Sequence, residues 1–153
     1  MLMNFLALLL LVAAPQADVF KKEMAPLQSA VDGLVKSAGA QVLEPPRAAY
    51  IEGYGIIISL YMTFEVPQGI FGTPKKPAEL RKLVEQRRKD VQEKLTTFVT
   101  RSVATTDSIG STDSLAIVIH VLNTYPGDLP NLPGQIVLTA KKESPQQVAF
   151  REF

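Results

Sequence analysis

The sequence predicts an α+β protein, a two-layer sandwich in which two helices cover one face of an antiparallel or mixed sheet of about four strands. Residues 20–38 and 78–103 have apolar residues at helical spacing. Residues 56–66 and 115–122 instead have an apolar residue at every second position, which is the spacing of a strand. Each helical segment is followed by a pair of strand-like segments, so the expected order of elements is αββαββ.

The N-terminal segment resembles a secretory signal peptide. Residues 1–17 carry no charged side chain, and Phe5 to Ala14 are continuously apolar. About ten apolar residues suit a signal peptide, whereas a membrane-spanning helix needs roughly 20. Charged composition begins at Asp18, so we expect cleavage after Ala17, which leaves residues 18–153 as a single α+β domain.

Two features of this segment depart from the usual pattern. Met1 to Asn4 contain no Lys or Arg, and Pro15 stands where a small residue is preferred. An uncleaved N-terminal anchor and a buried core helix are therefore the alternatives to a cleaved signal peptide. With either a cleaved signal peptide or an anchor, the domain would be exported, to a periplasmic or extracellular location.

The first helix is predicted from the spacing of its apolar residues, and Gly39 follows it where a C-terminal cap would lie. The stripe consists of Phe20, Met24, Leu27, Val31, Leu34, Val35 and Ala38. Pro26 interrupts the pattern because proline lacks an N–H and clashes with the preceding turn. The start of the helix is therefore open between Asp18 and Ala25 or Pro26.

A hairpin is predicted next. Pro45 and Pro46 exclude a central strand between residues 41 and 51 but permit an edge strand. Every second residue from Ile56 to Val66 is apolar, which predicts a strand. Glu52-Gly53 would supply the tight turn between these two segments.

The second helix is expected from Ala78 to Val103, with Pro77 at its first turn. Its apolar stripe is broken by Arg87. Three oppositely charged pairs four residues apart are expected on its polar side, namely Arg81–Glu85, Glu85–Lys89 and Asp90–Lys94. Acidic residues lie among its basic ones, so we interpret this surface as a solvated helix face in preference to an anion site.

A central strand is predicted over residues 115–122, because both of its faces are largely apolar. A loop rich in proline then leads to residues 135–142, and the two segments would form a second hairpin. The pattern in residues 144–153 is too brief to count as a strand, although Val148 and Phe150 would suit an edge.

Composition excludes several classes of function. The formal net charge of +1 gives no field that would attract nucleic acid, so we expect no nucleic-acid partner. The absence of cysteine removes disulfides, thiolate metal sites and thiol nucleophiles. Contact with a membrane is expected only through an uncleaved N-terminal segment. We expect no cofactor and no metal.

The single histidine, His120, has two interpretations. It would be a general base or ligand in a small envelope enzyme, or a partly buried structural imidazole. We favour the structural role, because no nucleophile or orienting carboxylate is placed beside it by any motif. Asp107 and Asp113 likewise suit an ordinary polar loop better than a calcium site. A calcium-binding loop has acidic ligands at every second position and a glutamate at its end, and this segment has neither.

The sheet face opposite the helices is the candidate interaction surface. It is expected to be less polar than a solvated face usually is. Its members would be Ile57, Ser59, Tyr61, Thr63, Val118, His120 and Leu122. The leading hypothesis is a binding or protein-interaction module, whose partner is a second copy in a homo-oligomer or another envelope protein. A loop or the C-terminal tail folding over this face is the competing possibility.

Overall fold

The computed structural model describes residues 15–65, 72–73 and 75–153. Its elements, in chain order, are α1 (Pro15–Ser37), β1 (Gln41–Ile51), β2 (Gly55–Thr63), α2 (Pro77–Thr105), β3 (Ser114–Val121), β4 (Gln135–Lys141) and β5 (Ala149–Glu152). The predicted α+β class is confirmed. The sheet has five strands instead of four, because β5 pairs with β4 at one edge.

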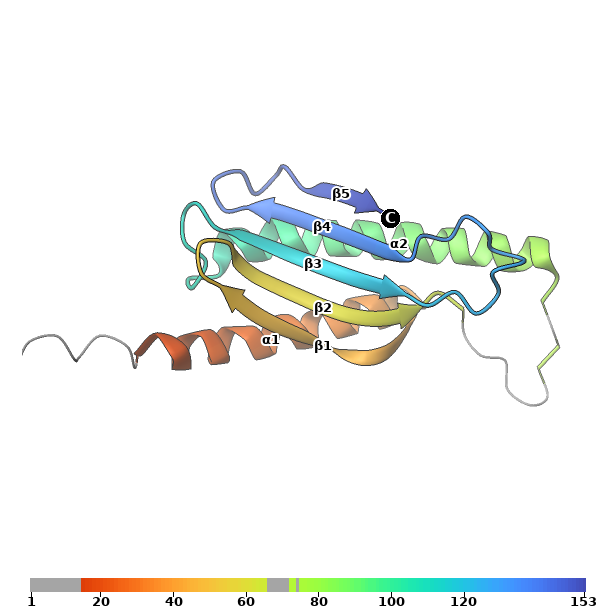
Figure 1. Ribbon diagram of the computed structural model, residues 1–153, viewed down its shortest axis with the longest axis horizontal. Coiled ribbons are helices and arrows are strands. Elements are labelled where there is room, and N and C mark those ends of the chain that lie inside the picture. The colour runs from red at the N-terminus through yellow and green to blue at the C-terminus, as the bar shows by residue number, and fades with distance from the viewer. Residues whose placement is uncertain (1–14, 66–71, 74) are drawn as a thin grey trace, which may run out of the picture.

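The sheet is mixed, and its strands follow the chain order from β1 to β5 (Figure 1). The pairs β1–β2, β3–β4 and β4–β5 are antiparallel, so both predicted hairpins are present. Strands β2 and β3 are parallel, and α2 is the crossover that a parallel pair requires. This arrangement makes β3 the central strand, as its two apolar faces predict.

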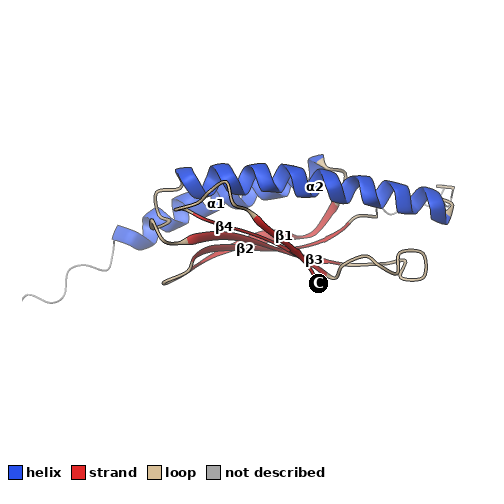
Figure 2. Cartoon of the chain, turned by 90° about the horizontal axis from the view of Figure 1, so that it is seen from above, coloured by secondary structure: helices blue, strands red, loops and turns tan. Residues whose placement is uncertain are grey.

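Both helices lie on one face of the sheet, as predicted, and no described element covers the other face (Figure 2). The core lies between the two layers. Alternate residues of β2, β3 and β4 point into it, because successive side chains of a strand project to opposite faces. Its fully buried members on these strands are Ile56, Ile58, Leu60, Met62, Leu115, Ile117, Ile119, Ile136 and Leu138. Buried residues of α1 and α2, including Val31 and Leu95, complete it.

Helix α1 begins earlier than expected and continues through Pro26. Pro26 is exposed, and so is Lys22, whose carbonyl loses its helical partner. Water can therefore satisfy that carbonyl, which lowers the cost of proline inside the helix. The first turns of α1 extend beyond the end of the sheet (Figure 1).

The basic residues of α2 differ from the prediction in what they contact. Of the three expected pairs, only Glu85–Lys89 forms an ion pair in the described chain, at 3.8 Å. The side chain of Arg81 instead donates to the Asp128 carbonyl, and Arg87 donates to the Phe64 carbonyl. Arg87 breaks the apolar stripe because it reaches the end of β2.

Arg88 joins α2 to β5 through a bidentate pair with Glu152. Its Nε lies 2.7 Å from Glu152 Oε1, and its Nη2 contacts Oε2. These hydrogen bonds hold the pKa of Arg88 above its usual value. The pair shows that Glu152 projects toward the helices, so the residues before and after it project to the opposite face.

The predicted signal peptide falls mainly outside the described residues, which begin at Pro15. Helix α1 spans the expected cleavage position after Ala17. Within the described residues, neither helix combines the length and apolarity needed to cross a membrane.

Candidate functional site: the open face of the sheet

The face of the sheet opposite the helices is called here the open face. The parallel register of β2 and β3 brings the two halves of the predicted surface together. It pairs Ser59 with Val118 and Tyr61 with His120. Residues that are about 60 positions apart in the chain therefore lie side by side, as expected if both hairpins share one sheet.

The predicted residues differ in how accessible they are. Tyr61 is 47% exposed and Leu122 is 51% exposed. The other apolar and polar members of the middle of the face are half-buried, namely Ile57, Ser59, Val118 and His120. In the described chain, nothing folds over Tyr61 and Leu122 to bury them.

Thr63 was placed on this surface by the strand alternation, but it is only 4% exposed. Its hydroxyl contacts Glu65 Oε2, and the Thr124 hydroxyl donates to the same oxygen at 2.9 Å. Glu65 therefore connects the end of β2 to the segment after β3 and buries Thr63. We exclude Thr63 from the accessible surface for this reason.

Tyr61 and His120 stack on each other. Their ring centroids are 4.5 Å apart and the planes differ by 19°. Face-to-face packing of this kind holds both rings upright on the sheet and limits their rotamers. The two side chains therefore form one rigid aromatic feature.

The arrangement around His120 lacks the parts that general-base catalysis needs. Within the described chain, no carboxylate is hydrogen-bonded to its imidazole, and His120 lines neither the cavity between α1 and α2 nor the one beside Arg81 and Arg88. A catalytic imidazole needs an orienting partner and a concave site for substrate. The observed contact of His120 is the stacking partner Tyr61.

Sequence reasoning missed part of the open face, because strands β4 and β5 could not be aligned with β3 in advance. The register now adds Val137, which pairs with Val118, and Arg151, which pairs with Val137. On the opposite edge, Arg47 pairs with Ser59. Phe153 exchanges backbone hydrogen bonds with Gln135 and is 67% exposed.

The open face is therefore largely apolar in its middle and carries an arginine at each of its two edges. Ile57, Val118 and Val137 lie toward the centre, and the Tyr61–His120 stack stands beside them. Arg47 on β1 and Arg151 on β5 are exposed at the edges. Protein interfaces have this organisation, with an apolar centre and a polar rim.

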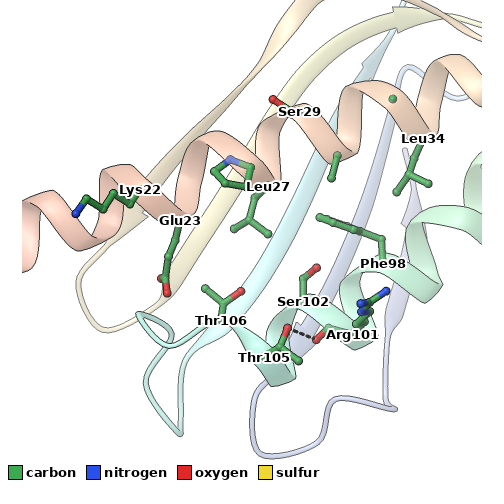
Figure 3. A pocket seen from close by; sticks show the side chains of 13 residues that line it. Lys22, Glu23, Leu27, Ser29, Leu34, Phe98, Arg101, Ser102, Thr105 and Thr106 are labelled. Carbon is green, nitrogen blue, oxygen red and sulfur yellow. Dashed lines mark hydrogen bonds between the residues drawn. The ribbon is translucent and has the colours of Figure 1, made fainter.

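A concave region lies between α1 and α2, on the other side of the molecule from the open face (Figure 3). It has a volume of about 700 Å³ and an apolar lining that includes Leu27, Leu34 and Phe98. Two of its polar side chains bond to the backbone. Thr105 donates to the Arg101 carbonyl at 3.0 Å, and Glu23 accepts from the Ser108 N–H at 3.0 Å. Glu23 and Thr105 therefore have a structural role here.

The loop that contains Asp107 and Asp113 has the structural role predicted for it. Asp113 Oδ2 accepts from the Gly110 N–H at 3.2 Å and from the Tyr50 hydroxyl at 3.4 Å. Burial and this carboxylate raise the pKa of Tyr50 above its usual value. Among the residues that the structure describes, no group of three or more His, Cys, Asp or Glu side chains could hold a metal ion.

Comparison with known proteins gave no match to a protein-family model, to a curated protein or to a solved structure.

Proposed function

We propose that this protein is an exported protein-interaction module that binds its partner through the open face. The observation that supports this proposal best is the exposure of Tyr61 and Leu122 beside half-buried Val118, on a face that no described element covers. Large apolar side chains grouped on an exposed surface favour a contact site over a merely solvated one.

The chemistry of the face suits a protein partner. The solvent-facing side chains of a sheet are normally polar. On the open face, in contrast, the aliphatic side chains of Ile57, Val118 and Val137 lie in the middle. Tyrosine is enriched among the residues that contribute most to binding, and the stack with His120 holds Tyr61 in one orientation. Less conformational entropy is then lost when a partner binds.

Export is proposed from the N-terminal sequence. The apolar segment from Phe5 to Ala14 and the change of composition at Asp18 suit a cleaved leader. A chain without cysteine is compatible with an oxidising compartment, because it cannot form unwanted disulfides.

Site-specific photo-crosslinking in the source cells tests the proposed interface. A photoreactive amino acid would replace Leu122 on the open face in one strain and Lys89 on the outer surface of α2 in another. Both positions are exposed, so the two reporters differ mainly in the face they sample. We expect a discrete protein adduct from position 122 and none from position 89. Equal adducts from both positions, or none from position 122, would contradict the proposal.

A further inference from the structure

Two arginines occupy opposite ends of one row across the open face. The pairing runs from Arg47 on β1 through Ser59, Val118 and Val137 to Arg151 on β5. Four strand spacings of about 4.8 Å separate the two ends, so their Cα atoms lie about 19 Å apart. The row has an uncharged centre and a positive charge at each end.

Neither arginine forms an ion pair or a side-chain hydrogen bond with any described residue. Three of the four arginines of α2 differ in this respect, because Arg81, Arg87 and Arg88 all bond to a loop or to the sheet. Glu44 lies on the same face, opposite Tyr61, but no ion pair joins it to Arg47 in the described structure. The guanidinium groups of Arg47 and Arg151 are thus available to a partner.

These charges disfavour a symmetric pair of copies packed face to face with aligned strands. In aligned packing the strands of the two sheets lie within about 30° of each other, and a two-fold axis relates the two copies. If the axis runs along the central strand β3, Arg47 of one copy faces Arg151 of the other. If the axis runs along the row, each arginine faces its own equivalent. Both arrangements bring like charges together at the rim, which opposes association.

We infer that the partner is a polypeptide whose contact surface is apolar in its middle and carries carboxylates toward both ends. This inference rests on the proposed function of the open face and identifies the chemistry of what binds there. Arginine suits carboxylates because its planar donors can bind both oxygens. Single-stranded nucleic acid fits less well, because it needs a continuous positive groove, and here the centre between the arginines is uncharged.

Selection from a phage-displayed library of random 16-residue peptides tests this inference with the purified domain. We expect selected peptides to combine Asp or Glu with apolar or aromatic residues. Arg47→Glu with Arg151→Glu should weaken their binding at least about tenfold, and added salt should also weaken it. Arg101→Glu with Lys82→Glu is the matched control, since both residues are exposed on the helices and the change of charge is the same.

The outcomes separate the inference from the proposed function. If the selected peptides no longer bind the Tyr61→Lys variant but bind the Arg47→Glu, Arg151→Glu variant normally, the open face is still the interface. The inference that the partner is acidic would then be wrong. Self-association through Tyr61, or tighter binding of a single-stranded oligonucleotide at the same face, would also overturn it. If no selected peptide responds to Tyr61→Lys, the proposed function itself is wrong.

Discussion

Gly55 lies directly against the backbone of Ser114, where the parallel pair of β2 and β3 begins. A Cβ atom on Gly55 would come within 2.1 Å of the Ser114 carbonyl oxygen, and φ of Gly55 is +118°. Both the space and the backbone conformation therefore require glycine. We predict that Gly55→Ala lowers the free energy of unfolding by about 3 kcal/mol, measured by urea denaturation.

The neighbouring Gly53 provides the control for this prediction. It also has a positive φ, of +74°, but a Cβ there would meet nothing within 4 Å. Gly53→Ala should cost only about 1 kcal/mol, the usual cost of the left-handed conformation. Equal losses for the two variants would show that contact with Ser114 is unimportant.

The turn at Gly53 and the strand pattern after it were predictable, but the contact of Gly55 with Ser114 was not. Local sequence identifies glycine as a turn residue, and this indication was sufficient for the hairpin. The pairing of β2 with β3 joins segments about 60 residues apart, and its register depends on how α2 packs. Strand β5 was missed for a related reason, since four residues carry too little periodicity to be recognised without their partner strand.

The Arg88–Glu152 pair should stabilise the attachment of β5 to the rest of the fold. Both side chains are about three-quarters buried, and the geometry is bidentate. We predict a coupling energy of about 1 kcal/mol from a double-mutant cycle with Arg88→Met and Glu152→Gln. The exposed pair Lys141–Glu143 is the control and should give less than about 0.5 kcal/mol.

His120 is expected to act through its stack with Tyr61 and not through proton transfer. We predict that His120→Gln lowers the free energy of unfolding by about 1 kcal/mol, because the ring contact is lost. The yield of the photo-crosslinked adduct from position 122 should fall less in the His120→Gln variant than in the Tyr61→Lys variant. A variant with unchanged stability that abolishes a turnover activity of the protein would restore the enzyme hypothesis.

Processing after Ala17 is expected to leave the packed part of α1 intact. Among the side chains of α1 that the structure describes, the first buried one is Leu27, followed by Val31 and Val35, well beyond the cleavage position. We predict that intact-mass measurement after expression in a host with a Sec pathway shows loss of residues 1–17. A chain that starts at Asp18 should also melt at the same temperature as the longer form. Recovery of the full-length chain from the cytoplasm would contradict export.

The candidate site could be predicted only in part. Strand alternation placed Tyr61, Val118 and His120 on one face, because a period of two needs no tertiary information. It could not show that Thr63, at the end of β2, is buried beside Glu65, which accepts a hydrogen bond from Thr124. Arg47 and Arg151 were not recognised, because their common row exists only after four strand registers are known.

The most direct test of the interface is Tyr61→Lys in the strain that carries the photoreactive residue at position 122. Because Tyr61 is half-exposed and outside the core, the melting temperature should fall by less than about 5 °C. The adduct should nevertheless disappear, because a charged ammonium would replace the aromatic ring at the centre of the contact. Persistence of the adduct, or global unfolding of the variant, would contradict the assignment of the open face as a contact surface.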